Sequence, residues 1–327
     1  MLSWIIIFKS LYFFLSFIIF LLLTVAFYTL LERHILGSVQ RRSGPEIVGP
    51  VGLGQPLADG IKLFLKETII PKAANKLIFI LAPIFCLSFS LLGWLVMTFT
   101  LDIYMVNLNI AVLYIFAIST LNAHTIIFAG WASNSKYAFL GCIRSAAQFI
   151  SYELSLGLIV MTIALISGSF CLQDILLNQS HVWHVFSLAP LFAIFFSLVI
   201  AETNRHPFDL PEAESELVSG FNVEYSAMSF ALFFVAEYSN IILMSCLIVV
   251  FFLGGSSFFE YSFYNRIFFT LKLLFFMTLF VVIRAVFPRF RFDQLMRLGW
   301  KCFLPITLSF HFIYSSCLIS FDHLYNF

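Results

Sequence analysis

Residues 201–224 read AETNRHPFDLPEAESELVSGFNVE, and a long apolar run lies on each side of this stretch. A charge at the edge of a bilayer or inside its hydrocarbon costs about 2.5 to 3.5 kcal/mol, so such acids normally face a cavity and serve a function. The pattern therefore predicts a path for protons or ions beside membrane-spanning helices. The stretch holds one Arg and one His against six carboxylates: Glu202, Asp209, Glu212, Glu214, Glu216 and Glu224.

The composition of the whole chain predicts a polytopic membrane protein. Hydrophobic residues make up 61% of the 327 residues and charged residues only 11%, with a mean hydropathy of +0.99. Such values exclude a soluble domain, because apolar runs of about 18 residues or more signal spanning helices. A net charge of +1 argues against a general affinity for nucleic acid, which requires a basic surface.

The predicted fold class is all-α, with eight transmembrane helices in one domain that covers residues 1–327. The first apolar run has no cleavage motif behind it, so we expect it to remain as a helix. Residues 202–222 are expected to form an acidic loop between the fifth and sixth spans. The predicted spans are residues 4–31, 77–100, 107–130, 149–170, 185–201, 223–253, 266–287 and 303–321.

Lys and Arg gather in the first, third, fifth and seventh connections between these spans. Of the 18 basic residues, only Lys9, Arg266 and Lys272 lie elsewhere. By the positive-inside rule, these four connections face the cytoplasm or the mitochondrial matrix, and both termini lie on the opposite side. Asp and Glu contribute little to topology, so the acids that crowd on the same side need another explanation.

The first connection joins a loop rich in Gly and Pro to an amphipathic helix. Residues 44–56, GPEIVGPVGLGQP, contain too many Gly and Pro for regular structure, and their spacing is not that of a phosphate-binding loop. Residues 57–66 are expected to form a helix at the membrane surface, where its apolar face would contact lipid. One face carries Leu57, Ile61, Phe64 and Leu65, and another carries Asp59, Lys62 and Lys66.

Local structure offers a second interpretation of several acids. Glu153 lies near the start of the fourth predicted span, where favourable contact with the helix dipole is the alternative to a functional role. Asp209 and Glu212 have the spacing of a capping box, so a short acidic helix is plausible there. Capping does not explain the remaining acids. Glu237 lies 13 residues after Glu224 inside the sixth span, so we expect it to be protonated or paired.

Metal sites are not indicated by the sequence. The six Cys residues show no C-x-x-C pair, and His181 and His184 have no third ligand nearby. The seventh connection, residues 284–305, alternates Arg with aromatic residues, which is typical of binding to anionic lipid headgroups. Docking of an acidic partner is the alternative interpretation of that segment.

Four segments together resemble, in order and spacing, the loops of the family of NADH-ubiquinone oxidoreductase chain 1. That family supplies the membrane subunit of respiratory complex I at the junction with its hydrophilic arm. The likeness extends over about Leu30 to Pro305. The segments are residues 32–67 (ERHILGSVQRRSGPEIVGPVGLGQPLADGIKLFLKE), 141–153 (GCIRSAAQFISYE), 201–238 (AETNRHPFDLPEAESELVSGFNVEYSAMSFALFFVAEY) and 284–305 (RAVFPRFRFDQLMRLGWKCFLP).

The resemblance implies a tunnel that admits ubiquinone from the bilayer and a chain of acids that leads from it toward proton-pumping subunits. The tunnel residues that it implies are Glu32, Arg33, Asp59, Phe64, Arg205, Phe234 and Arg284. The proton-path residues that it implies are Glu67, Glu153, Glu202, Asp209, Glu212, Glu214, Glu216, Glu224 and Glu237, with no metal ligand. On this interpretation the chain is an enzyme subunit without a complete active site of its own.

The resemblance also implies partners. Ubiquinone is the expected substrate, whereas FMN and iron–sulfur clusters belong to other subunits, because this chain has no flavin, haem or cluster motif. Expected partners are the hydrophilic-arm subunits, including the one with the terminal cluster, the neighbouring membrane-arm subunits, and anionic lipid such as cardiolipin. The expected location is the mitochondrial inner membrane, with a bacterial plasma membrane as the alternative.

Two other functions stay open from the residues. A free-standing proton-coupled secondary transporter also has acids at mid-membrane, but transporters usually consist of repeated halves. The chain has no second copy of its Gly/Pro loop or its acidic stretch. The related subunit of a membrane-bound hydrogenase would share the fold without a need to bind quinone.

Overall fold

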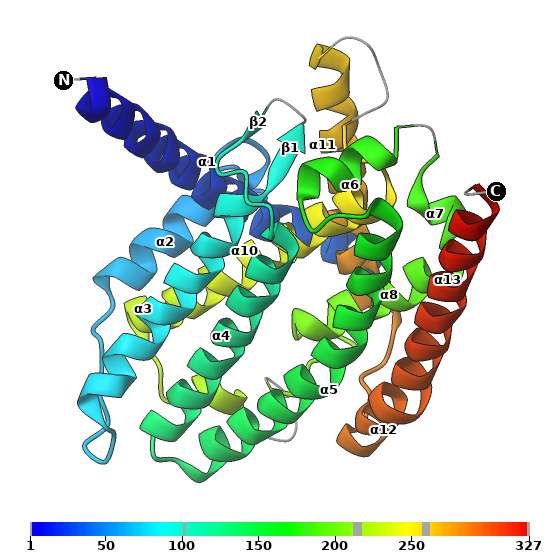
Figure 1. The fold of residues 1–327 in the computed structure, drawn as a ribbon. Helices are drawn as coiled ribbons and strands as arrows, with labels where there is room; N and C mark the ends of the chain where they lie inside the picture. Colours follow the sequence, from blue (N-terminus) through cyan, green and yellow to red (C-terminus); the bar gives the residue numbers. More distant parts are fainter. Residues whose placement is uncertain (1, 101–102, 181, 212–217, 257–261, 326–327) are drawn as a thin grey trace.

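The computed structural model describes residues 2–100, 103–180, 182–211, 218–256 and 262–325, and nearly all of these are helical or in short connections (Figure 1). The described residues contain two very short strands, β1 (Thr98–Thr100) and β2 (Ile103–Tyr104), which pair antiparallel. The prediction of an all-α polytopic fold is therefore confirmed.

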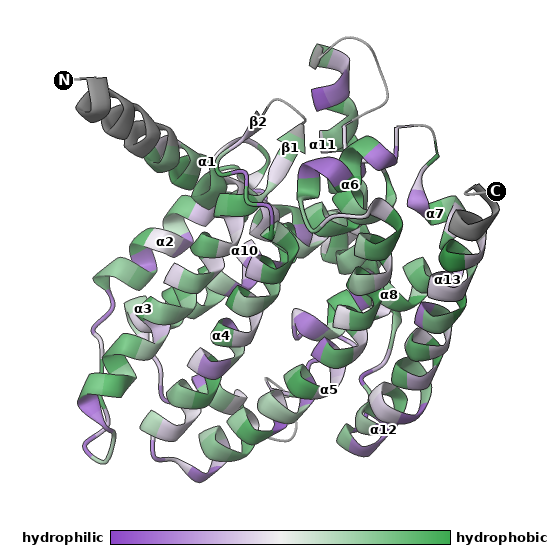
Figure 2. Ribbon diagram, viewed as in Figure 1, coloured by the Kyte–Doolittle hydropathy of each residue, from purple (hydrophilic) through white to green (hydrophobic). Residues whose placement is uncertain are grey.

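The helices follow the predicted apolar runs, and hydrophilic residues gather at their ends and in the connections (Figure 2). In chain order the helices are α1 (Leu2–Val39), α2 (Gln55–Leu65), α3 (Lys76–Gly93), α4 (Ala111–Ala132), α5 (Lys136–Ser167), α6 (Leu172–Asn178), α7 (His184–Ser187), α8 (Ala189–Glu202), α10 (Ala227–Phe252), α11 (Ser262–Val286), α12 (Phe292–Arg297) and α13 (Leu304–Tyr325). Shorter helical turns are η1 (Pro50–Gly52), η2 (Trp94–Val96), η3 (Gly220–Asn222) and the π-helical η4 (Leu298–Phe303).

Seven helices among the described residues are long and apolar enough to cross a membrane. The fifth predicted span corresponds to α8, which has 14 residues. At about 1.5 Å per residue, α8 is shorter than the roughly 30 Å of bilayer hydrocarbon. The count of eight spans therefore stays a prediction.

Several predicted boundaries differ from the structure, and α1, for example, continues to Val39, past the predicted end at residue 31. Residues 94–100 form η2 and β1 instead of continuing the second span, because α3 ends at Gly93. The third connection is helical, since α5 begins at Lys136, where Ser135 caps it by accepting a hydrogen bond from the Ala138 N–H at 3.4 Å. Glu153 consequently lies in the middle of α5, and the interpretation that it interacts with the start of a helix is also wrong.

Helix α10 lies at the centre of the bundle. In its most apolar window 78% of the residues are buried, against 22% in the N-terminal span of α1 and 6% in the span that contains α13. It packs against α1, α2, α3 and α11, while α13 runs along one edge of the molecule (Figure 1). An acid on α10, such as Glu237, is thus placed inside the protein and away from lipid.

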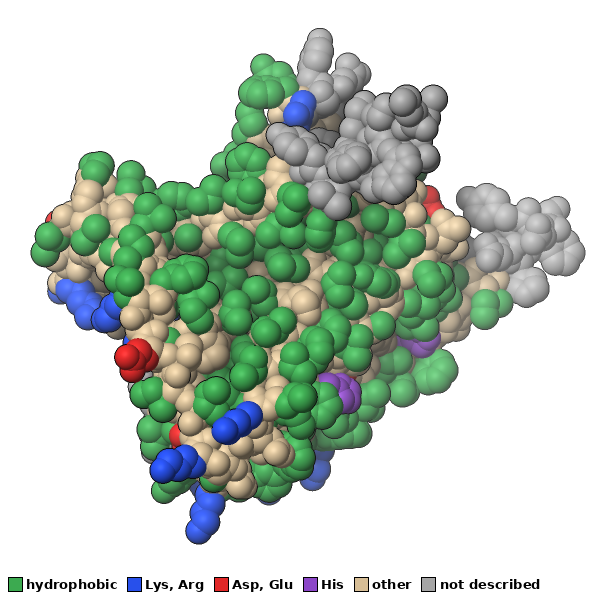
Figure 3. Space-filling model, turned by 90° about the vertical axis from the view of Figure 1, so that its left-hand side faces the viewer, with side chains coloured by type: hydrophobic (Ala, Val, Ile, Leu, Met, Phe, Trp, Pro, Cys, Tyr) green, Lys and Arg blue, Asp and Glu red, His purple; other side chains and the backbone are tan. Residues whose placement is uncertain are grey.

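Hydrophobic side chains cover the outer surface of the bundle. Figure 3 shows one such face, on which most of the visible Lys and Arg side chains lie toward the lower end. In Figure 1 the connections that follow α2 and α4 lie at one end of the bundle, together with α12. This arrangement suits a protein surrounded by lipid, with charged groups at the level of the headgroups.

Candidate functional site

Glu32 of α1 lies in a largely buried group of polar side chains, of which only Arg284 is exposed and which we call the Glu32 cluster: Glu32, Arg205, Glu237, Tyr238 and Arg284. The Glu32 side chain is only 3% exposed and forms ion pairs with Arg205 and with Arg284. The Tyr238 hydroxyl donates a hydrogen bond to Glu32 Oε2 at 2.7 Å. A buried carboxylate is thereby matched by two cations and one hydroxyl donor.

Arg205 links Glu32 to Glu237 of α10. Its Nη1 lies 3.1 Å from Glu237 Oε1, and its guanidinium lies 4.9 Å from the centre of the Tyr238 ring. The turn after α8 positions Arg205, because its N–H donates to the Ile200 carbonyl at 3.2 Å. Burial lowers the pKa of Arg205, but Glu237, Tyr238 and Glu32 raise the pKa well above its usual value, so the guanidinium stays charged.

Helix α2, the amphipathic helix predicted from its pattern, packs on α1 and α10 beside this cluster. Arg33 Nη1 and Asp59 Oδ2 lie 2.8 Å apart and join α1 to α2. Gln55 Nε2 also donates to Asp59 Oδ1 at 3.0 Å. Phe64 on the apolar face of α2 is 71% exposed, so this face is open to lipid or to an apolar ligand.

An apolar groove of about 680 Å³ lies between α1, α10 and α11. Its wall includes Tyr28, whose ring packs edge to face against Tyr238 at 5.7 Å between centroids. The groove therefore approaches the Glu32 cluster from an apolar side. Phe234 is nearby, with its ring centroid 6.5 Å from that of Tyr238.

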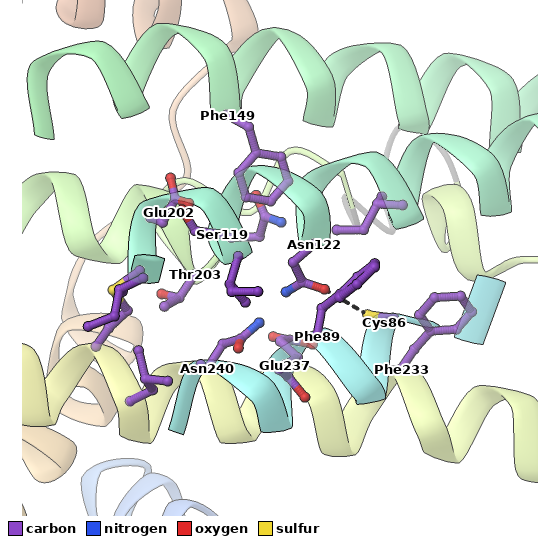
Figure 4. A pocket seen from close by; sticks show the side chains of 18 of the residues that line it. Cys86, Phe89, Ser119, Asn122, Phe149, Glu202, Thr203, Phe233, Glu237 and Asn240 are labelled. Atoms are coloured by element: carbon purple, nitrogen blue, oxygen red, sulfur yellow. Dashed lines mark hydrogen bonds between the residues drawn. The ribbon is translucent and has the colours of Figure 1, made fainter. Parts of the chain in front are cut away.

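A cavity of about 70 Å³, with both polar and apolar side chains in its wall, lies between Glu237 and Glu202, the last residue of α8 (Figure 4). One water needs about 10–15 Å³, so the cavity has room for several. Glu202 Oε2 and Asn204 Oδ1 are buried and have no hydrogen-bond partner among the described residues, which also favours water there. Polar residues of the wall are Cys86, Ser90, Ser119, Asn122, Glu202, Thr203, Asn204, Asn222, Glu237 and Asn240.

Two more of the predicted acids interact with this arrangement. Glu153 of α5 is half-buried and interacts electrostatically with Glu202. Asp209 forms an ion pair with Arg289 at 3.4 Å and interacts electrostatically with Glu237. The described acids thus form a series from Glu32 through Glu237 and the cavity to Glu202 and Glu153.

Other predicted residues lie elsewhere. Glu67 is exposed beyond the end of α2, and Glu224 is half-buried before α10 and is not part of the cavity wall. Glu212, Glu214 and Glu216 lie outside the described residues, as does His181. In the part of the chain that the structure describes, no group of three or more His, Cys, Asp or Glu residues could hold a metal ion.

The sequence interpretation missed several polar members of the site. Tyr238 contacts both Glu32 and Arg205, and Asn240 and Asn122 face the cavity (Figure 4). A signal was present for two of them, because the run Glu237-Tyr-Ser-Asn240 interrupts an otherwise apolar helix. Asn122 lies in α4 among other small polar residues, so no sequence pattern marks it as a residue of the site.

Comparison with known proteins gives one family. A family model described as NADH dehydrogenase matches residues 13–315. The chain is 52% identical to NADH-ubiquinone oxidoreductase chain 1 of Cyanidium caldarium, over 94% of this chain and 91% of that protein. It is 51% identical to the protein of the same name from Arabidopsis thaliana, over 93% of this chain and 95% of that protein. It is also 52% identical to an NADH-quinone oxidoreductase subunit of Rickettsia bellii, over 94% of this chain and 92% of that protein.

Proposed function

The chain belongs to the NADH dehydrogenase family, and we propose that its Glu32 cluster borders a quinone site from which a series of acids carries protons toward the rest of the complex. As a family member it is a core membrane subunit of NADH:quinone oxidoreductase, complex I. A secondary transporter or a hydrogenase subunit is not favoured, because the relatives are named as subunits of NADH:quinone oxidoreductases.

The quinone part of the proposal is supported by two apolar surfaces, one on α2 and one that approaches the charged Glu32 cluster through Tyr28. The face of α2 that carries Phe64 and the groove that ends near Tyr28 both suit an isoprenoid tail. Ubiquinone is the proposed substrate, and reduction to the quinol takes up two electrons and two protons. FMN and iron–sulfur clusters in partner subunits would supply the electrons.

The proton part of the proposal is supported by the position of Glu237, which is the single observation that carries it. One carboxylate oxygen of Glu237 contacts Arg205 in the Glu32 cluster, and the same residue lines the cavity that reaches Glu202. A change of charge at a quinone beside Arg205 would therefore alter the field at Glu237. Water in the cavity would let protons move between Glu237 and Glu202.

Glu237→Gln in the assembled complex tests this proposal. The amide keeps the shape of the side chain but cannot ionise, so we expect quinone reduction and proton pumping to fall while native gels still show the large complex. Glu46→Gln, an exposed acid in the Gly/Pro loop, is the matched control. Normal pumping at normal turnover in Glu237→Gln would contradict the proposed path.

The protein is a multi-pass inner-membrane protein, and the proposed location is the mitochondrial inner membrane with the basic connections in the matrix. On that side the proposed partners are hydrophilic-arm subunits, including the one with the terminal cluster. Arg291, Arg297 and Trp300 are exposed around α12, which suits anionic headgroups such as those of cardiolipin. Neighbouring membrane-arm subunits would cover other faces of the bundle.

A further inference from the structure

A pocket of about 470 Å³ lies where the connection before α3 meets the connection between α4 and α5. The Asn75 N–H donates to the Ala132 carbonyl at 3.0 Å, and so joins the two connections. Asn134 Nδ2 joins them a second time, because it donates to the Ala73 carbonyl at 3.2 Å. Both connections lie at one end of the bundle (Figure 1). We call this site the Lys136 pocket, and its wall includes Asn75, Trp131, Asn134, Ser135, Lys136 and Phe139.

Positive charge surrounds the Lys136 pocket. Lys136 is exposed in the wall itself, and Lys72 and Lys76 are exposed on the connection before α3, next to two other residues of the wall. Among the described residues that form the wall, none is acidic. Residues 68–76 and 131–143, which contribute most of the pocket, contain no Asp or Glu. Lysine ammonium groups bind phosphate as point charges, so the pocket suits a phosphate group.

The Lys136 pocket lies at the level of the lipid headgroups. Trp131 is one residue before the end of α4, and Lys136 is the first residue of α5, so both apolar helices end beside the pocket. Trp131 and Tyr137 are exposed there, and Trp and Tyr are enriched where a membrane meets water. The pocket is on the basic side of the predicted topology. Basic pockets between spanning helices on that side of a membrane bind the headgroups of anionic lipids.

An apolar surface continues from the pocket toward the middle of the bilayer. Trp131 and Phe139 are exposed in the wall of the pocket. Leu140 and Ile143 are exposed beside Phe139 and one turn further along α5. A free phosphate ion would leave these side chains uncovered. A phospholipid has both a phosphate for the pocket and acyl chains for the apolar surface.

We propose that the Lys136 pocket binds the phosphate headgroup of an anionic phospholipid, whose acyl chains lie on the apolar surface between Trp131 and Ile143. The bound lipid would hold the start of α3 against the connection between α4 and α5. The pocket shares no residue with the Glu32 cluster, with the cavity or with α12. The lipid site can therefore exist whether or not the proposed acid path is correct.

A photo-reactive lipid tests this site in the assembled complex. The complex is reconstituted in phosphatidylcholine vesicles that contain a small share of phosphatidylglycerol with a photo-reactive acyl chain, and the labelled peptides are mapped. We expect label within residues 131–143 despite the excess of phosphatidylcholine. Unlabelled phosphatidylglycerol should displace this label, whereas inorganic phosphate should not, because it lacks acyl chains.

A pair of double variants tests the role of the lysines. Lys76→Gln/Lys136→Gln removes two positive charges beside the pocket, and Arg41→Gln/Arg42→Gln removes two exposed charges elsewhere on the same side of the membrane. Each lysine near an anionic headgroup strengthens binding about fivefold. We therefore expect labelling to fall at least about tenfold in the first variant and to stay near the native level in the second. Lys136→Arg keeps the charge and should keep most of the label.

Three results would overturn the proposal. Equal labelling in the two double variants would show that lipid covers this surface without recognition of its headgroup. A native complex without label in residues 131–143 would show that another subunit covers the pocket. Displacement of the label by inorganic phosphate would show an anion site that does not select lipid. The competition experiments use the native complex, so they do not depend on the assembly of any variant.

Discussion

Glu32 and Arg205 form a buried ion pair although 173 residues separate them in the chain. Their side chains are only 3% and 9% exposed, so neither charge is solvated by bulk water. Removing one partner of a buried pair leaves an uncompensated charge, which is more costly than replacing both. The pair therefore fixes the turn after α8 against α1 and sets the charge of the proposed quinone site.

Arg205→Met should destabilise the complex around this pair. The change keeps much of the volume but leaves Glu32 and Glu237 with less positive charge, and breaking a buried pair costs about 3–5 kcal/mol. We expect less assembled complex on native gels, a lower temperature of inactivation and weaker binding of quinone-site inhibitors. Arg42→Met, at an exposed position, is the control. Unchanged assembly and inhibitor sensitivity in Arg205→Met would indicate that Arg205 only helps to orient the chain in the membrane.

Glu202→Gln should separate catalysis from assembly. Glu202 is buried at the end of α8, and its Oε2 has no hydrogen-bond partner among the described residues, so an amide fits without losing a known protein contact. We expect quinone reduction and pumping to fall while the complex assembles normally. NADH oxidation with an artificial acceptor should be unaffected, and Glu46→Gln is again the control. Normal pumping in Glu202→Gln would show that Glu202 is not part of the proposed proton path.

The sequence predicted those parts of the fold that depend on local pattern. The apolar runs located most of the spanning helices, and the two faces of residues 57–66 located α2. The early start of α5 was missed because Lys136, Arg144 and Gln148 interrupt the apolar pattern of residues 136–148, although Gln148 is fully buried in the structure. Its amide donates to the carbonyls of Ala201 at 2.8 Å and Phe208 at 2.9 Å, and such distant partners leave no local signal.

The candidate site was predictable to a similar degree. An excess of acids between apolar runs indicated Glu202 and Glu237, because uncompensated charge is rare there. The sequence could not show that Arg205 lies between Glu32 and Glu237, since this requires α1, α8 and α10 to meet. The cavity also depends on side chains from several helices, so its volume and wall come only from the packing.

The ion pair between Arg33 and Asp59 should hold α2 in place with a small free energy. The two side chains are 50% and 39% exposed, and exposed pairs typically contribute about 0.2–1 kcal/mol. Arg33→Ala and Asp59→Ala should each raise the KM for quinone slightly, and the double variant should be no worse than either alone. Additive effects on KM in the double variant would show that the pair is not the link between α1 and α2.

His206 should make the turn after α8 sensitive to acid. Burial lowers the pKa of His206, and the nearby Arg289 and Arg284 lower it further. The unfolded chain, with an ordinary pKa of about 6.5, then binds more protons than the folded one, so stability falls as pH drops below that value. Inactivation temperatures measured between about pH 7.5 and 5.5 should fall less in His206→Gln than in the native complex. If the inactivation temperatures of His206→Gln and of the native complex fell equally with pH, His206 would not be the source of the acid sensitivity.

Phe64→Trp tests whether α2 forms a wall of the quinone route or only rests in lipid. Phe64 is 71% exposed on the apolar face, so an indole fits without disturbing a core. If the face lines the route, the larger ring should raise the KM for long-tailed ubiquinone more than for a short-tailed analogue. NADH oxidation with an artificial acceptor should stay normal, and Phe128→Trp, exposed on α4, should change neither KM. Equal effects on both quinones, or none, would make α2 a lipid anchor and leave the groove beside Tyr28 as the route.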